Sequence, residues 1–145
     1  MLQIQLLREN PQYVIDRLKI KNFDATDLVK EILKLDSDSR ADKKAIDDNL
    51  MEQNQGAKAI GNLFKEGKRD EAEAIKARMT ELKDKERALR TELQELEKNL
   101  QAKMVLLPNL PHSSVAPGKG AEDNEIVYTE GDASNFDFEA LPHWD

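Results

Sequence analysis

Apolar residues recur at alternating spacings of three and four through the second half of the chain's long central region. Between 70 and 104 these positions are nearly all apolar, and only Glu86 among them is polar. They are Ala72, Ile75, Met79, Leu82, Glu86, Leu89, Leu93, Leu96 and Leu100. A heptad stripe of this kind is typical of a helix that packs along a narrow seam against another helix.

The preceding segment, 27 to 65, carries a weaker stripe with the same spacing. Its positions are Leu28, Ile32, Leu35, Ser39, Asp42, Ile46, Asn49, Gln53, Gly56, Ile60 and Leu63. Beyond this segment, Gly67 suits the left-handed position after a helix end, and Asp70 with Glu73 can cap a new helix. The two helices, about 58 and 52 Å long at 1.5 Å per residue, should therefore form an antiparallel hairpin.

Folding this hairpin about its turn predicts a register. Residues whose numbers sum to about 135 face each other, so that Leu63 meets Ala72 and Ile60 meets Ile75. Glu86 then falls opposite Asn49. A polar pair within an apolar seam lowers stability but fixes the register of the two helices. We therefore expect Asn49 and Glu86 to act as a register pin rather than as a catalytic or metal-binding pair.

A short helix is predicted before the hairpin. Asn10 followed by Pro11 fits a helix start, and Val14, Ile15 and Leu18 fall on one helical face before an end near Lys21. Either Asp24 or Thr26 can cap the first long helix.

The second long helix should run from about 70 to about 104, and prolines at 108, 111, 117 and 142 indicate that the chain beyond Leu107 is an extended linker. We expect a helical arm over 1–107 and a linker tail over 108–145. In this tail the run 126–128 and the alternating Phe136 and Phe138 are typical of strands. We expect the tail beyond about Leu110 to be poorly packed or to lie on a neighbouring molecule, because Phe136, Phe138, Leu141 and Trp144 have no core of their own.

The composition supports an elongated all-α protein. Aromatic residues make up only 5% of the chain, and charged residues make up 35%. A chain with so few aromatic and so many charged residues does not form a large globular core. The absence of cysteine excludes disulfides and thiolate metal sites and, with no signal peptide or membrane span, favours a cytoplasmic protein. The two histidines, His112 and His143, are far apart, and we expect neither a metal site nor catalytic residues.

Charge is unevenly distributed along the chain. Residues 104–145 contain one basic and eight acidic residues, which accounts for the entire net charge of −7. Between 58 and 90, by contrast, ten basic residues stand against seven acidic ones. The acidity therefore belongs to the tail, and the distal half of the hairpin is mildly basic.

One edge of the predicted hairpin carries basic residues at intervals of seven. They are Arg69, Lys76, Lys83 and Arg90, and they face Phe64, Ala57, Leu50 and Lys43. A row of unpaired cations about 10 Å apart on a rigid rod can follow a phosphate backbone. Alternatively, the long stems of these side chains only cover Phe64 and Leu50 while their charged ends stay in water. The residues alone leave both readings open.

The whole chain resembles the N-terminal part of bacterial-type seryl-tRNA synthetases. The resemblance rests on the start MLQIQLLRENPQYVIDRLKIKNFD, on GKRDEAEA at the hairpin turn, and above all on LLPNLPHSSVAPGKGAEDNE followed by FDFEALPHW. Two departures fall in the linker and tail: Ala116 separates the valine from Pro117, and IVYTEGD lacks an arginine and a tryptophan often found there.

This resemblance implies that the hairpin is a tRNA-binding arm. It would recognise the long variable arm and the elbow of its tRNA by phosphate and shape contacts. A class II catalytic domain, using ATP and Mg²⁺ in a homodimeric parent enzyme, would attach serine to the 3′ end. Residues 108–145 would be the linker and the start of that domain. The 145-residue chain, which stops before the class II motifs, should hold no cofactor and be inactive alone.

The candidate tRNA-binding residues are the basic side chains of the distal half of the hairpin. They are Lys58, Lys65, Lys68, Arg69, Lys76, Arg78, Lys83, Lys85, Arg87 and Arg90. The alternative function is a protein-binding or spacer coiled-coil hairpin, which the same heptads would serve equally well.

Overall fold

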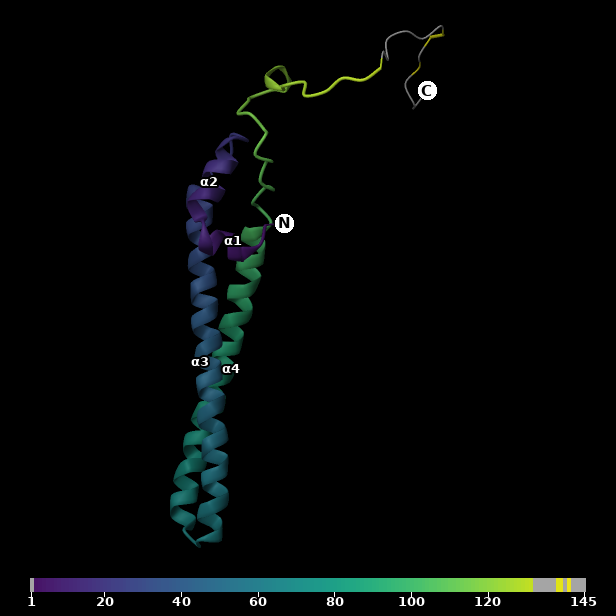
Figure 1. Ribbon diagram of the computed structural model, residues 1–145. Coiled ribbons are helices and arrows are strands. Elements are labelled where there is room, and N and C mark those ends of the chain that lie inside the picture. Colours follow the sequence, from purple (N-terminus) through teal and green to yellow (C-terminus); the bar gives the residue numbers. More distant parts are fainter. Residues whose placement is uncertain (1, 132–137, 140, 142–145) are drawn as a thin grey trace.

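Two long antiparallel helices form the body of the protein in the computed structural model, which describes residues 2–131, 138, 139 and 141 (Figure 1). The order of elements is α1 (Ile4–Glu9), α2 (Pro11–Lys19), α3 (Thr26–Lys65), α4 (Arg69–Met104) and the 3-10 helix η1 (Ala121–Asp123). No strand occurs in the described residues. The all-α hairpin is confirmed, whereas the sequence did not predict α1.

The helices α3 and α4 contain 40 and 36 residues and begin one residue earlier than expected. Their register agrees with the pairing derived from the heptads. A Cβ atom on Gly56 would lie 3.4 Å from Met79, and Lys103 forms a 2.6 Å ion pair with Glu31 near the other end of the seam. No helix of the described residues is both long and apolar enough to cross a membrane.

The turn between the long helices is closed by backbone hydrogen bonds. Gly67 has a φ of 77°, the left-handed conformation expected past a helix end. The Lys68 N–H donates to the Leu63 carbonyl at 3.0 Å, and the Gly67 N–H donates to the Phe64 carbonyl at 3.3 Å. The expected cap at Asp70 is wrong, because α4 already begins at Arg69 and Asp70 lies within its first turn.

The seam between α3 and α4 is narrow and partly polar. Ile46, Ala72 and Leu82 are buried, but many other seam residues stay half-buried because two helices cannot enclose each other. The Asp42 side chain also points into the seam, where its Oδ2 atom is buried without a hydrogen-bond partner.

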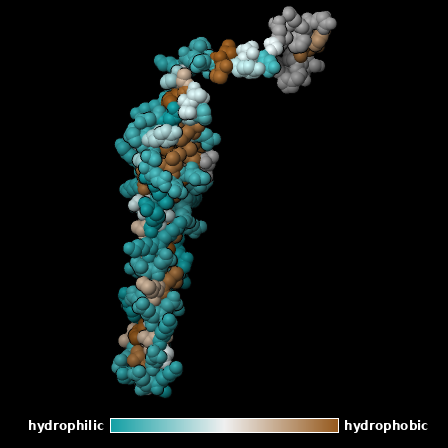
Figure 2. Space-filling view, in the orientation of Figure 1, coloured by the Kyte–Doolittle hydropathy of each residue, from teal (hydrophilic) through white to brown (hydrophobic). Residues whose placement is uncertain are grey.

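The largest apolar core lies at the end of the rod opposite the turn, where α1 and α2 pack across the long helices. Leu7, Val14, Leu18, Val29 and Ile32 are fully buried there. Met104 and Leu107 close the same cluster from the end of α4. Figure 2 shows apolar side chains gathered at this end and a mostly hydrophilic rod below. The hairpin is therefore anchored at its base and projects its turn into solvent.

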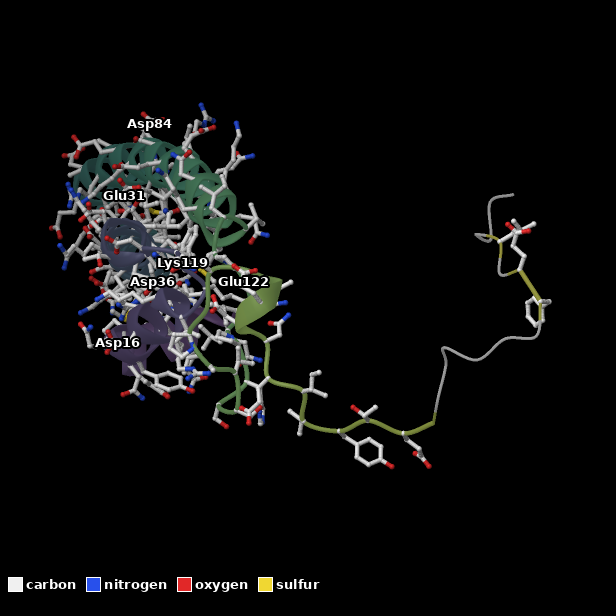
Figure 3. All side chains as sticks on the ribbon, turned by 90° about the horizontal axis from the view of Figure 1, so that it is seen from above. Asp16, Glu31, Asp36, Asp84, Lys119 and Glu122 are labelled. Atoms are coloured by element: carbon white, nitrogen blue, oxygen red, sulfur yellow. The ribbon has the colours of Figure 1, made fainter. Side chains whose placement is uncertain are left out.

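A buried carboxylate joins α1 to α3 beside this core. The Arg8 guanidinium donates to both oxygens of Asp36, with Nε 2.8 Å from Oδ2, and Arg40 Nε donates to the same Oδ2 at 3.1 Å. The Asp36 side chain is only 4% exposed. Hydrogen bonds from Arg8 hold its pKa below the usual range and outweigh the opposing effect of burial. Figure 3 labels Asp36 among the helices in a view from above.

The linker after α4 is held against α2 as far as Gly118. Leu110 packs on the core, and the Arg17 guanidinium donates to the carbonyls of Pro111, at 3.0 Å, and His112. Lys21 Nζ donates to the Asn109 carbonyl at 3.0 Å, and the Asn22 amide donates to the Gly118 carbonyl at 2.7 Å. Residues 112–117 are nevertheless exposed, which agrees with the poor packing expected beyond Leu110. The sequence did not predict that side chains of α2 and the turn after it would donate to the linker carbonyls.

Residues within 118–124 still line a hollow with 20–22, and beyond them the tail extends away from the rod (Figure 1). Ile126, Val127 and Tyr128 are 81%, 89% and 76% exposed, and they form no strand. Phe138 and Leu141 are exposed too, while Phe136 and Trp144 lie outside the described residues.

Replacing Asp36 by asparagine should destabilise the fold by about 2 kcal/mol at pH 7, because hydrogen bonds to an ionised partner are lost. The folded-state pKa of Asp36 is lowered, so its contribution is complete above the ordinary aspartate pKa. That contribution disappears as the pH falls through the lowered pKa. Urea unfolding followed by circular dichroism should show the two proteins converging in acid, whereas a constant gap would contradict this account. Asp48→Asn, on an exposed position of α3, is the matched control.

Replacing Asp42 by leucine should stabilise the hairpin by roughly 1 to 2 kcal/mol, because an unpaired buried carboxylate oxygen is removed from the seam. The midpoint of thermal unfolding measures the effect. Asp47→Leu, at an exposed position of α3, should bring no comparable gain. Equal increases in the unfolding midpoint of both variants would show that leucine stabilises α3 at either position, whether or not the carboxylate is buried.

Candidate nucleic-acid interface

Two contacts define one long edge of the hairpin. Near its base, Lys43 Nζ forms a 2.7 Å ion pair with Glu97, and near the turn, Lys76 Nζ lies 5.0 Å from the centroid of the Phe64 ring. Residues seven apart on a helix lie nearly on one line. Positions 50 and 57 of α3 and positions 83 and 90 of α4 therefore lie along the same edge.

The α4 side of this edge is basic. We call it the basic edge, and its members are Arg69, Lys76, Lys83, Arg87 and Arg90. The α3 side carries no charge from 50 to 64. This neutral strip consists of Leu50, Asn54, Ala57, Gly61 and Phe64. An anion approaching this edge between Leu50 and Phe64 meets cations on one helix and no carboxylate on the strip of the other.

Three members of the basic edge surround one shallow hollow on α4. Lys83, Arg87 and Arg90 line it together with Glu86, Thr91 and Gln94. Within the described part of the chain, Lys83 and Arg87 have no acidic partner. Arg90 Nε donates to Glu86 Oε1 at 2.7 Å, which lowers the pKa of the Glu86 carboxyl, and Gln53 adds a second hydrogen bond. The hollow therefore presents two uncompensated cations and a third that shares its charge.

The predicted row of four unpaired cations is wrong for two of its members. Lys76 pairs with Glu73 at 2.7 Å, and Arg90 pairs with Glu86. The prediction considered only acids across the seam, but these partners stand three and four residues earlier on the same helix. The Lys76–Glu73 pair is exposed on both sides and contributes little, so another anion can replace its carboxylate. The Glu86 side chain is only 18% exposed and is also held by Gln53. Arg69 and Lys83 stay free of acidic partners among the residues described.

The other predicted tRNA-binding residues do not share one surface. Arg78 donates to Glu52 at 3.1 Å and to Glu81 at 3.2 Å, and the first of these bonds chiefly raises its pKa. Lys68 pairs with Glu66 at 2.9 Å. Lys58, Lys65 and Lys85 are exposed, and no carboxylate of the described residues pairs with them. Arg78 lines a separate hollow with Gly56, Ile75 and Met79. The ten candidate residues therefore lie on several surfaces of the rod, and only five of them belong to the basic edge.

The polar layer in the seam involves a third residue that the sequence analysis did not single out. Gln53 Nε2 donates to Asn49 Oδ1 and to Glu86 Oε2, each at 2.8 Å, and thus bridges the two. Asn49 also donates to the Leu82 carbonyl at 3.0 Å. Gln53 was visible as a seam position, and its spacing of four from Asn49 is the signal that could have identified it. The register-fixing role of Asn49 and Glu86 stays a prediction.

The structure offers no arrangement for metal-assisted chemistry in the residues it describes, where no three His, Cys, Asp or Glu side chains are placed to share an ion. What the described surface offers is fixed positive charge at regular intervals on a rigid support. Such an arrangement suits binding of a polyanion.

Comparisons with known proteins point to one family. Residues 1–111 match the model of the seryl-tRNA synthetase N-terminal domain. Across its whole length the chain is 37% identical to a serine–tRNA ligase of Salinibacter ruber, 36% to that of Thermotoga maritima and 35% to that of Exiguobacterium sibiricum. The chain spans 34%, 34% and 33% of these three proteins, respectively.

The family match covers all four α-helices and the start of the linker held by α2. It therefore includes the hairpin, its turn, the basic edge and the packed base. The chain belongs to the seryl-tRNA synthetase N-terminal domain family.

Proposed function

We propose that this chain is the tRNA-binding arm of a serine–tRNA ligase. Its hairpin contacts the long variable arm and the elbow of the tRNA, mainly through phosphates. The observation that carries this proposal is the basic edge, where Lys83, Arg87 and Arg90 gather around one hollow opposite a strip without charge. Membership of the family and the serine–tRNA ligase relatives support the same partner.

The dimensions of the basic edge suit a nucleic-acid backbone. Between Arg69 and Arg90 it extends about 31 Å along α4, at 1.5 Å per residue. Cations at intervals of about 10 Å on one line can each neutralise a phosphate of a regular double helix. A rigid rod holds these intervals constant, so affinity depends on the shape of the RNA. Duplex RNA is recognised mostly in this way, since its major groove is too deep and narrow for side chains to read.

Shape recognition also gives a reason for selectivity among tRNAs. The charged side chains of the basic edge are long, and among the described residues Lys83 and Arg87 form no ion pair that would fix their direction. They suit phosphates better than base edges, because base readout needs side chains held in defined geometry. An RNA is then preferred for the presence of a long variable arm rather than for its sequence.

In the complete enzyme, the arm would position the tRNA so that a catalytic domain attaches serine to its 3′ end, using ATP and Mg²⁺. The linker held by α2 would join the two parts. We further propose that the parent enzyme is a cytoplasmic homodimer.

The chain should bind a tRNA with a long variable arm more tightly than a tRNA with a short one. Affinity should fall steeply with salt, because each phosphate contact releases condensed cations, and log K should change by about 0.9 per contact for each unit of log salt. Fluorescence anisotropy titrations at several salt concentrations measure both quantities. Equal and weak binding of all RNAs would favour the alternative of a protein-binding or spacer hairpin.

Reversing the charge of Lys83, Arg87 and Arg90 to glutamate should lower affinity at least tenfold and reduce the salt slope by about 2 to 3, if each contacts one phosphate. Lys30, Lys34 and Lys44, near the base of α3, provide a matched triple reversal with the same change in net charge. That control should cost much less. A larger loss on reversing Lys58, Arg78 and Lys85 would place the RNA on another surface of the rod and overturn our assignment.

A further inference from the structure

An aromatic ring lies at the surface near the turn of the hairpin. Phe64 is in the last turn of α3 and is 45% exposed. It is one of few aromatic residues, which make up only 5% of the chain. A single exposed apolar residue is ordinary in itself. Phe64 is distinguished by its surroundings, because Lys76 of the basic edge lies over its ring with Nζ 5.0 Å from the centroid.

The cations around this ring are available to an external anion. Lys65 and Arg69 have no acidic partner in the part of the chain described, and Lys68 pairs only with the exposed Glu66. Lys76 shares its charge with Glu73 at 2.7 Å, but both side chains are largely exposed. Exposed ion pairs and exposed cation–π contacts are each weak, so Lys76 can exchange Glu73 for a phosphate without leaving the ring.

There is also room beside the ring. Gly61 lies one turn before Phe64 on the neutral strip, and a Cβ atom added there would have no neighbour within 4 Å. The helix surface next to the ring is therefore open backbone rather than side chain. A flat group that covers the ring can extend over this surface.

We propose that Phe64 and Lys76 together bind one nucleotide of the RNA, the base stacking on the exposed part of the ring and the phosphate pairing with Lys76. The idea rests on the proposed function and adds a contact of another kind to the phosphate contacts of the basic edge. Unpaired bases and bases at the end of a helix are commonly held on aromatic rings, and such stacking accepts any base. Phe64 therefore sets where the rod's turn meets the RNA, without reading its sequence.

Titration of the 145-residue chain with a tRNA that has a long variable arm tests this proposal. Phe64→Leu keeps an apolar side chain but removes the ring, so affinity should fall roughly tenfold while the salt slope stays unchanged. Lys76→Gln should lower the salt slope by about one. Tyr13→Leu is the matched control, because Tyr13 is 52% exposed on α2 at the opposite end of the rod, and it should leave affinity unchanged.

A second variant reports stacking directly. The chain has one tryptophan, so Phe64→Trp in a Trp144→Phe background places a single fluorophore at the site. Its emission should be quenched on saturation with the tRNA and protected from iodide. Unchanged affinity of Phe64→Leu, or an unquenched tryptophan at saturation, would overturn the nucleotide site while leaving salt-dependent binding intact. If instead no variant and no unmodified chain bound tRNA, the proposed function itself would fail, and the nucleotide site with it.

Discussion

The narrow seam between α3 and α4 is the constraint on which the rest of the molecule depends. Each of two packed helices buries only one side, so the rod buries little apolar area to offset the entropy lost on folding. Its unique register must therefore come from few contacts. Two features add contacts to this seam: a polar layer in which Gln53 bridges Asn49 and Glu86, and a packed base in which α1 and α2 close over the helix ends. The basic edge owes its regular spacing to the continuous helix α4, and the register decides which α3 residues lie beside it.

Much of the fold could be predicted from the sequence because its signals are local. The heptads predict where the long helices run, Gly67 predicts the turn between them, and Pro108 predicts where the second one stops. The structure agrees with these positions closely. The sequence did not predict α1, because its six residues are too short for a periodic pattern and the helix is stabilised by packing, including the hydrogen bonds from Arg8 to Asp36 across 28 positions. The hold of α2 on the linker was missed for the same reason, since side chains that donate to distant carbonyls leave no pattern.

The candidate interface could be predicted only in outline. Spacing of seven correctly indicates which residues share an edge, as the contacts of Lys43 with Glu97 and of Lys76 with Phe64 confirm at its two ends. It does not indicate how charge is compensated, because long side chains choose among several neighbours of similar energy. By its position in the heptad pattern, Glu52 could pair with more than one basic side chain, and only the structure shows that it pairs with Arg78. The pairing of Lys68, Lys76, Arg78 and Arg90 with nearby carboxylates is therefore seen only in the structure.

The hydrogen-bonded linker limits how far the turn of the hairpin can be displaced. At 1.5 Å per residue α3 is a lever about 60 Å long, so a swing of only 5° or so at its base displaces the turn by about 5 Å. The donors of Arg17, Lys21 and Asn22 tie the outgoing chain to the base over 109–118, which leaves no slack segment directly behind the lever. The three side chains that shorten the free part of the outgoing chain thus lie at the other end of the molecule from the turn.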